Sequence, residues 1–228
     1  MRRIFLGDLH GNWQATQSLA ALLPGLRADE TWFMGDAVGK GPDSVLTCDW
    51  VREHCDRFIG GNWDYGIGGR EYAEDGYFWD RLGEERLRWL NGLPREAELE
   101  IAGIPFRLFH GRPVTELLRV QDDRDRLEAP FRDGERRWGG VIFADSHRPF
   151  FRTLTGYIAN TGSVGNSMGV PKAHALVVDE LPGGALSMAI LCVPYDNEAA
   201  AEAARRETEL PHRAEYIREV LTGVYARG

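Results

Sequence analysis

Side chains that bind metal ions recur in the sequence just after short apolar runs. Carboxylates, imidazoles and one amide stand at these positions: Asp8, His10, Asp36, Asn62, His110, Asp145 and His147. In an open α/β sheet the carboxyl ends of the strands form the ligand crevice, so we expect these side chains to converge. Their mixture of oxygen and imidazole donors suits divalent ions such as Mn, Fe, Co, Zn or Mg. A carboxylate can bridge two such ions, which lie about 3.5–4 Å apart in hydrolytic two-metal sites.

The elements that must position these donors alternate along the first part of the chain. Short buried strands are predicted by three apolar runs, at 4–6, 31–34 and 58–59. Asn12 is expected to cap a helix that runs to about Leu23, and another helix follows over about 42–54. Strand, loop and helix in alternation predict a largely parallel α/β layer.

The rest of the sequence has a different pattern. It predicts two strands within 97–109, a helix within 115–137, a strand at 141–143 and a second sheet from the strands of 150–193. The tail, 196–228, predicts two helices, the second with an apolar face formed by Ala214, Ile217, Leu221 and Val224. We expect one domain over residues 1–228, made of two packed sheets with outer helices and with the tail packed on it.

Composition narrows the class of protein. The chain has 228 residues, 43% of them apolar, which suits one domain with a sizeable core. A net charge of −8 excludes a general binder of nucleic acid, because the phosphates repel it, although a metal site can still attract phosphate. Three cysteines without a C-x-x-C pair indicate a reducing compartment. The apolar run 4–6 is too short for a signal peptide, and no stretch approaches the length of a membrane span. We therefore expect a cytoplasmic protein without a membrane partner, in an oligomeric state that the sequence leaves open.

Several segments resemble, in order and spacing, the motifs of the calcineurin-like metallophosphoesterases. They are Gly7–Asn12, Gly35–Pro42, Gly61–Asp64, His110–Gly111 and Ala144–His147, the last in the place of the family's Gly-His-Thr-His. Asn160–Gly165 resembles the family's Asn-Pro-Gly-Ser-Val-Gly turn. The tail from Val193 resembles a bacterial subgroup related to the diadenosine-tetraphosphatases and Ser/Thr phosphatases. The resemblance covers nearly the whole chain.

The resemblance implies a fold, a reaction and a set of ligands. The fold is an α/β four-layer α/β/β/α sandwich of two mixed sheets flanked by helices. Metal-generated hydroxide would hydrolyse a phosphomonoester, a phosphodiester or a nucleotide. Two divalent ions are expected, manganese first, with Fe, Zn, Co, Ni or Mg as alternatives. The first ion would be bound by Asp8, His10, Asp36 and His147, and the second by Asp36, Asn62 and His110, with Asp36 bridging. The implied catalytic residues are Asn62, Asp64 and His110.

Two positions depart from the family pattern. Trp63 stands where the family has a histidine that protonates the leaving oxygen, and tryptophan cannot act as an acid. Asp64 remains in place, where it would orient an imidazole introduced at Trp63. Asp145 stands where a histidine binds the second metal, which gives that site a harder character. These departures keep an alternative open, a degenerate member that binds metal or nucleotide with little turnover; a protein phosphatase is a further alternative.

A small phosphorylated substrate, with nucleotides among the candidates, is the expected partner. Lys40 matches an arginine of the symmetrical diadenosine-tetraphosphate hydrolases and Ser/Thr phosphatases, and it is a candidate phosphate ligand or a solvated lysine. Arg112 and Arg148 follow metal-ligand candidates and would clamp a second phosphate or form surface salt bridges. An aromatic pocket for a nucleobase is one interpretation, and core packing the other, for Trp13, Trp63, Tyr65 and Trp79.

Overall fold

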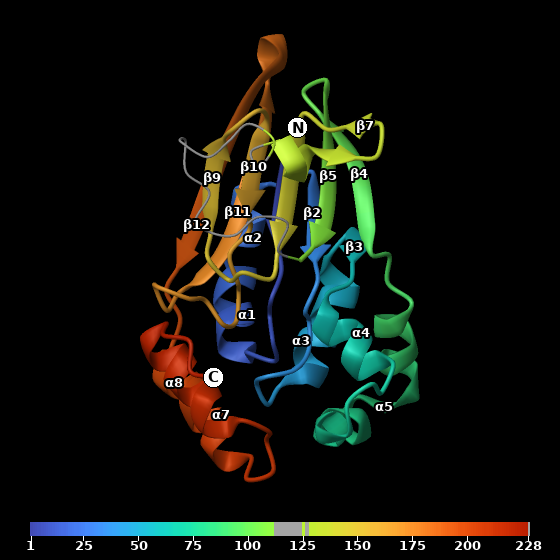
Figure 1. Ribbon diagram of the computed structural model, residues 1–228. Helices are drawn as coiled ribbons and strands as arrows, with labels where there is room; N and C mark the ends of the chain where they lie inside the picture. Colours follow the sequence, from blue (N-terminus) through green and yellow to red (C-terminus); the bar gives the residue numbers. More distant parts are fainter. Residues whose placement is uncertain (112–124, 126–127, 228) are drawn as a thin grey trace.

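The computed structural model describes residues 1–111, 125 and 128–227. Within them, two five-stranded mixed sheets pack face to face and helices flank them (Figure 1). This is the fold class expected from the sequence.

The first sheet has the strand order β12-β11-β1-β2-β3. Its strands are β1 (Arg2–Leu6), β2 (Glu30–Met34), β3 (Arg57–Ile59), β11 (Ala173–Leu181) and β12 (Ala185–Val193). β1, β2 and β3 run parallel, as the alternating pattern predicts, whereas β11 runs antiparallel to β1 and β12 antiparallel to β11. The carboxyl ends of the three parallel strands therefore lie at one edge of this sheet.

The second sheet has the order β4-β5-β8-β10-β9. Its strands are β4 (Glu96–Ile101), β5 (Ile104–His110), β8 (Gly140–Ala144), β9 (Phe150–Thr153) and β10 (Tyr157–Asn160). The expectation that residues 150–193 form one second sheet was wrong. β9 and β10 join that sheet, but β11 and β12 return to the first, because β11 pairs with β1. An apolar strand pattern does not specify which sheet a strand joins.

Helices cover the first sheet and extend beyond its strand ends. They are α1 (Trp13–Ala20), α2 (Leu23–Leu26), α3 (Ser44–His54), α4 (Asn62–Gly68), α5 (Gly76–Asn91), α7 (Asn197–Arg206) and α8 (Arg213–Thr222). Asn12 caps α1 as expected, accepting from the Ala15 N–H at 3.1 Å, but α1 ends at Ala20 and Pro24 lies in the separate turn α2. Short 3₁₀ turns cover Ala73–Asp75, Ala129–Phe131 and Pro182–Gly184.

The expected helix within 115–137 is contradicted over 132–137, whereas Asp125 and Glu128 are helical. β6 (Arg132–Asp133) and β7 (Arg136–Arg137) form a small antiparallel hairpin there, around Gly134 with its φ of 58°. Glycine adopts this left-handed conformation without a steric penalty, so the turn reverses the chain where a helix would have continued. Residues 115–124 and 126–127 lie outside the described residues.

Two large apolar cores and a small third one, formed by Phe131, Val141, Phe143 and Ile158, hold the described layers together. One large core lies between the sheets, where Phe5 and Met34 of the first meet Leu108 and Ile142 of the second. The other lies between the first sheet and its helices.

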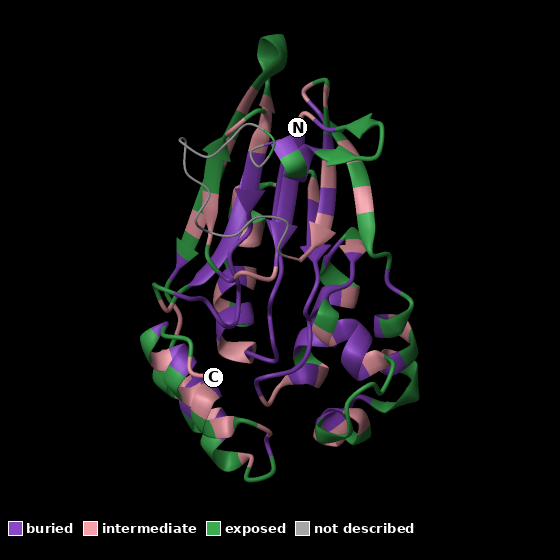
Figure 2. Cartoon of the chain, in the orientation of Figure 1, coloured by how far each residue is buried: buried purple, intermediate pink, exposed green. Residues whose placement is uncertain are grey.

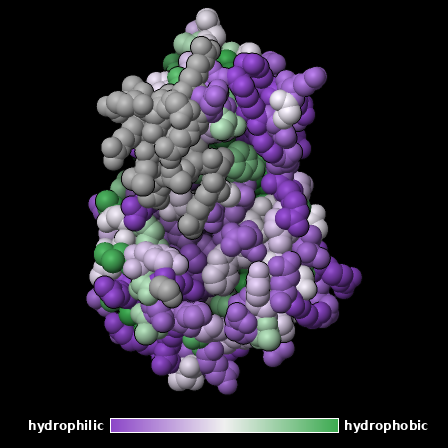
Figure 3. Space-filling model, viewed as in Figure 1, coloured by the Kyte–Doolittle hydropathy of each residue, from purple (hydrophilic) through white to green (hydrophobic). Residues whose placement is uncertain are grey.

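Burial continues from the strands into the loops at their carboxyl ends (Figure 2), although loops ordinarily lie at the surface. Hydrophilic residues dominate the face seen in Figure 3, where apolar residues form only small groups. The buried loops are therefore the unusual part of the molecule.

The tail packs only partly through the face of α8 expected from the sequence. Ile217 and Leu221 of that face pack against the core, but Ala214 and Val224 are exposed, and Tyr216, Glu219 and Val220 are the buried residues. The physical reason is that Glu219 is paired, accepting from the Asn166 amide at 3.2 Å and lying 3.3 Å from the Arg227 guanidinium. A paired carboxylate can be buried where a lone one cannot.

Among the described residues, no helix combines the length and the apolarity that crossing a membrane requires.

Candidate metal centre

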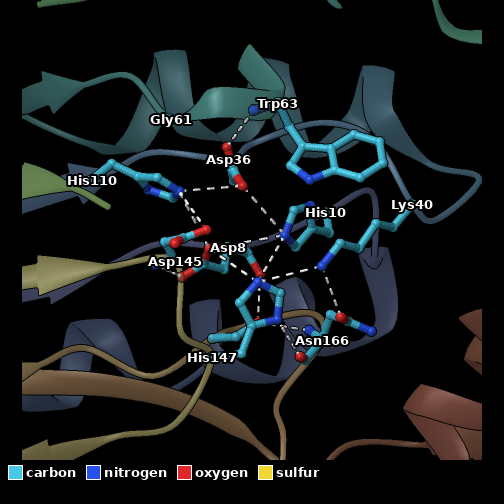
Figure 4. Close-up of polar contacts among 12 residues, drawn as sticks. Asp8, His10, Asp36, Lys40, Gly61, Trp63, His110, Asp145, His147 and Asn166 are labelled. Atoms are coloured by element: carbon cyan, nitrogen blue, oxygen red, sulfur yellow. Dashed lines mark hydrogen bonds and ion pairs between the residues drawn. The ribbon is translucent and has the colours of Figure 1, made fainter. Parts of the chain in front are cut away.

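The strand-end side chains converge on one point (Figure 4). Asp8 and His10 follow β1, Asp36 follows β2, His110 ends β5, and His147 lies in the loop after β8. Two groups of potential ligand atoms lie within 4.8 Å of one another: Asp8 with His10 and His147, and Asp8 with Asp36 and His110. Both sheets therefore contribute to one buried polar cluster.

The three histidines are oriented in the same way. Each Nδ1 lies at hydrogen-bond distance from a backbone carbonyl: Val38 O at 3.2 Å from His10, Met34 O at 2.7 Å from His110 and Asn166 O at 2.6 Å from His147. An Nδ1–H that donates to a carbonyl leaves the Nε2 lone pair free, which is the usual arrangement of a metal-binding histidine. All three Nε2 atoms therefore face the cluster as potential ligands.

The donor atoms of the first group need a cation between them. The Nε2 atoms of His10 and His147 lie 3.1 Å apart, and in the tautomers described above their lone pairs repel. Burial holds the pKa of His10 well below its usual value, so this imidazole is neutral. The buried Oδ1 of Asp8 lies 3.3 Å from His147 Nε2 and has no hydrogen-bond partner among the described residues. A divalent ion would satisfy all three atoms, so these residues fit a metal.

The second group also requires positive charge. His110 Nε2 lies 3.3 Å from Asp36 Oδ2 and, among the described residues, has no hydrogen-bond partner. Burial opposes a charged imidazole, yet Asp36 and Asp8 raise the pKa of His110 to about 10. Such a shift means that the carboxylates stabilise a cation at this position. A divalent ion bound by the same carboxylates would supply that charge.

Asp36 lies between the two groups, where a bridging ligand would lie. Its Oδ1 accepts the backbone N–H of Trp63 at 2.9 Å, while Oδ2 is 3.3 Å from His110 Nε2 and 3.5 Å from His10 Nε2. Asp8 Oδ1 is also shared, at 3.9 Å from both of those nitrogens. The geometry thus brings Asp8 close to the second group as well, whereas the sequence assigned it to the first metal alone.

Asp64 lies behind the donors and holds their loops together. Its Oδ2 accepts the N–H groups of Asp36 at 2.7 Å and Gly61 at 2.9 Å, and its Oδ1 accepts that of Ala37 at 2.9 Å. Burial and the neighbouring Asp36 raise the pKa of Asp64 to about 7. The backbone engages both oxygens, but Oδ1 accepts only one N–H, so the orientation of an imidazole at position 63 by Asp64 stays a prediction. We interpret Asp64 as a positioning residue.

The loops that aim the donors are conformationally strained. Positive φ angles occur at Asp8 (53°), His10 (46°), Asp36 (60°), Asp145 (87°) and His147 (59°). Each such residue costs about 1–3 kcal/mol and persists only where the surroundings impose it. A Cβ at Gly61 would lie 2.1 Å from Asp36 Oδ1, so only glycine permits this approach. The fold therefore prepares the donor geometry in advance.

The remaining ligand candidates lie at the rim of the cluster. Asp145 is partly buried, and its Oδ1 is 3.9 Å from His110 Nε2, near the second group. Its backbone N–H donates to Asp8 Oδ2 at 3.3 Å. Asn62 is exposed at the first turn of α4 and lines the adjoining cavity. The structure thus brings Asp145 to the site more directly than Asn62.

Of the three phosphate candidates, Lys40 reaches the cluster. It is buried, donates to Asn166 Oδ1 at 3.1 Å and lies 3.4 Å from His147 Nε2, so the alternative of a solvated lysine is excluded. Burial, and then the nearby Arg227, lower the pKa of Lys40 to about 8. Arg148 is exposed just after His147. Arg112 lies outside the described residues.

A cavity of about 320 Å³ adjoins the cluster. Trp63, Tyr72 and Phe78 form its aromatic wall, and Lys40 and Arg227 also line it. The Trp63 ring lies edge-on to His10, with the ring centroids 5.6 Å apart. A Cβ at Gly39 would lie 2.2 Å from the Trp63 ring, so this glycine leaves room for the indole.

The predicted aromatic pocket is only partly present. Trp63 lines the cavity, but the Tyr65 hydroxyl donates to the carbonyl of Pro94 at 2.9 Å, and Trp13 and Trp79 pack against the core. Sequence reasoning missed Tyr72, Asn166 and Arg227. Asn166 directly follows the Asn160–Gly165 turn, so that motif could have identified it. Nothing in the sequence singled out Tyr72 or Arg227.

Comparisons with known proteins agree with this geometry. Residues 1–176 match the family model of the calcineurin-like phosphoesterases. A metallophosphoesterase from Sphaerobacter thermophilus is 20% identical, with a TM-score of 0.75 over 98% of this chain and 100% of that one. A hypothetical protein from Pyrococcus horikoshii OT3 is 20% identical, with a TM-score of 0.79 over 99% of each chain. Yfce, a phosphoesterase from E. coli, is 16% identical, with a TM-score of 0.52 over 85% of this chain and 100% of that one. The search of curated proteins gave no match.

Proposed function

The chain belongs to the calcineurin-like phosphoesterase family and is a hydrolase of phosphoester bonds, and from this premise we propose that it binds two divalent ions. With these ions it would hydrolyse esters whose leaving group departs without a proton. The observation that carries this proposal is the pair of donor groups that share Asp8, with buried ligand atoms lacking hydrogen-bond partners in the described part of the chain. Manganese is the proposed metal, because carboxylate and imidazole donors occur together.

Each side chain has a proposed task in binding the ions. Asp8, His10 and His147 would hold the first, and Asp36 would bridge to the second, which His110, Asn62 and Asp145 complete. When bound, such ions activate water as a nucleophile and neutralise charge on the phosphoryl oxygens. The backbone carbonyls behind the three histidines keep their Nε2 atoms directed inward.

Trp63 determines which substrates suit this site. Its indole N–H donates hydrogen bonds but does not titrate as an acid. General-acid catalysis is typically worth about 10²–10⁴-fold, most where the leaving group is basic. Aryl esters and esters whose leaving group is itself a phosphate should therefore be cleaved faster than alkyl esters. We place the reaction in the cytoplasm because the buried free thiols of Cys48 and Cys55 suit a reducing compartment.

The proposal is tested by hydrolysis of p-nitrophenyl phosphate and bis-p-nitrophenyl phosphate with added manganese. We expect turnover that chelation abolishes and that manganese restores. Asp36→Asn should remove most of the bound metal and nearly all activity while leaving the fold intact by circular dichroism.

Wild-type protein that binds manganese tightly but hydrolyses neither ester would reject the enzyme and favour the non-catalytic binding alternative. Full activity and two tightly bound ions in Asp36→Asn would reject the bridging role of this carboxylate.

A further inference from the structure

Arg227 brings a partly buried cation to the cavity beside the metal cluster. Its Nε lies 3.3 Å from Glu219 Oε2, and its guanidinium carbon lies 5.8 Å from the centroid of the Trp63 ring. Its Nη2 is buried and has no hydrogen-bond partner among the residues that the structure describes. A buried guanidinium N–H without an acceptor is costly, so an acceptor that reached this atom would be stabilised.

Lys40 provides a second cation at the same aromatic ring. Its Nζ also lies 5.8 Å from the Trp63 ring centroid, and its side chain is buried. Glu219 partly balances the charge of Arg227, and Lys40, which donates to the neutral amide oxygen of Asn166, lies in the field of Glu219, Asp36 and Asp8. Two like charges in a poorly solvated cavity repel each other, and an anion between them would remove the repulsion. Lys40 and Arg227 thus form what we call the tail subsite.

The tail subsite adjoins the place where a phosphoryl group would react. Lys40 Nζ is 3.4 Å from Nε2 of His147, a ligand candidate of the first metal, and Arg227 lines the same cavity. Trp63 contacts both regions, with its ring beside His10 and beside the two cations. An anion bound here would therefore be a neighbour of the reacting phosphoryl group within one substrate molecule.

We infer that Lys40 and Arg227 bind a second phosphate on the leaving-group side, so that the substrates are phosphoanhydrides with a P–O–P linkage. This inference rests on the proposed function. Water would attack the terminal phosphorus, and the bond from that phosphorus to the bridging oxygen would break. The electron pair and the bridging oxygen would leave with the inner phosphate, and the proton of water would pass to solvent. The two cations stabilise the charge of that leaving phosphate. The leaving group therefore needs no proton, and the site can function with tryptophan instead of an acid at position 63.

Equilibrium binding of imidodiphosphate and orthophosphate, measured by calorimetry on the manganese-loaded full chain, tests the inference. Imidodiphosphate carries two linked phosphoryl groups and resists hydrolysis, whereas orthophosphate carries one. Arg227→Gln should weaken imidodiphosphate binding by about ten- to a hundredfold, the effect of losing a charge-assisted hydrogen bond, and leave orthophosphate binding unchanged. Arg218→Gln is the matched control, because it removes the same charge from an exposed position on α8.

A second variant guards against misfolding. Arg227→Gln leaves Glu219 buried without its cation, so the double variant Glu219→Gln/Arg227→Gln, which removes both charges, should show the same selective loss. If neither variant distinguishes the two ligands, or if both ligands are weakened equally, the tail subsite is refuted. The proposed function is judged separately by p-nitrophenyl phosphate, which has one phosphorus. A wild-type protein inactive on it but selective for imidodiphosphate would retain the subsite and lose the function.

Discussion

Replacing the buried carboxylate of Asp64 by an amide should weaken both the fold and the metal site. In Asp64→Asn, a single carbonyl oxygen replaces two carboxylate oxygens of almost the same shape. That oxygen can take the place of Oδ2, which accepts the N–H groups of Asp36 and Gly61. The new NH₂ group then faces the Ala37 N–H, which was 2.9 Å from Oδ1, so a donor opposes a donor.

The expected loss of stability follows from this count. One buried N–H loses its acceptor, which costs about 1–3 kcal/mol. The two remaining hydrogen bonds weaken because their acceptor is no longer charged. Part of this loss is recovered, because burial makes the ionised carboxylate itself unfavourable, as its raised pKa indicates. We expect the free energy of unfolding of the metal-free protein to fall by about 1–3 kcal/mol.

The metal should be held less tightly because the Asp36 loop loses its anchor. Changes to groups that orient metal ligands typically cost about 10–100-fold in affinity. Urea unfolding in the presence of chelator measures the first effect, and calorimetric manganese titration measures the second. Asp196→Asn removes the same charge at the exposed cap of α7, where asparagine caps equally well, and should change neither quantity. Wild-type stability together with wild-type manganese affinity in Asp64→Asn would show that Asp64 does not hold these loops.

Three further predictions concern other parts of the chain. Trp63→His should accelerate alkyl esters more than aryl esters, by up to about 10²–10⁴-fold, because the new imidazole can protonate a basic leaving group; identical dependence of rate on leaving-group pKa in both proteins would contradict this. Asp145→His should move metal preference from manganese toward zinc, and an unchanged ratio of the two dissociation constants would refute its role as a ligand. Burial and Lys172 lower the pKa of His174 to about 4, so its contribution to stability is complete above pH 6.5 and is lost as pH falls toward 4, by up to about 3 kcal/mol. Urea unfolding at pH 7 and pH 5 should therefore show a smaller difference in His174→Gln than in wild type.

The ligand cluster could be predicted because its local rules are strong. A short apolar run that ends at Gly-Asp predicts a buried strand with a carboxylate at its carboxyl end, and this holds for Asp8 and Asp36. Parallel strands then bring such ends together without any information about distant contacts. The histidine orientation could not be predicted, because the carbonyls of Met34, Val38 and Asn166 become neighbours only in the folded chain.

The tail was the least predictable part of the molecule. The face of α8 was chosen by apolar character, yet a charged residue, Glu219, occupies the buried face. Its burial depends on Arg227 and Asn166, and no short-range pattern connects these three residues. The membership of β11 in the first sheet was missed for the same reason, because strand pairing over such a separation leaves no local trace in the sequence.

The pairing of β1 has a consequence for the order in which the protein folds during synthesis. β1 lies between β2, its parallel neighbour, and β11, so one edge of the strand stays unpaired until Ala173–Leu181 has left the ribosome. Gly165, whose N–H donates to the Asp8 carbonyl at 2.9 Å, must also be present before the loop after β1 is fixed. Pairings between distant segments form slowly, because the entropy of closing the intervening chain is lost first.

Most of the chain is therefore synthesised before the first sheet is complete. Until then, the unpaired edge of β1 can pair with strands of other chains. We expect metal binding to be a late step, because the ligands come from both sheets and only chains whose sheets have already packed together can bind the ions.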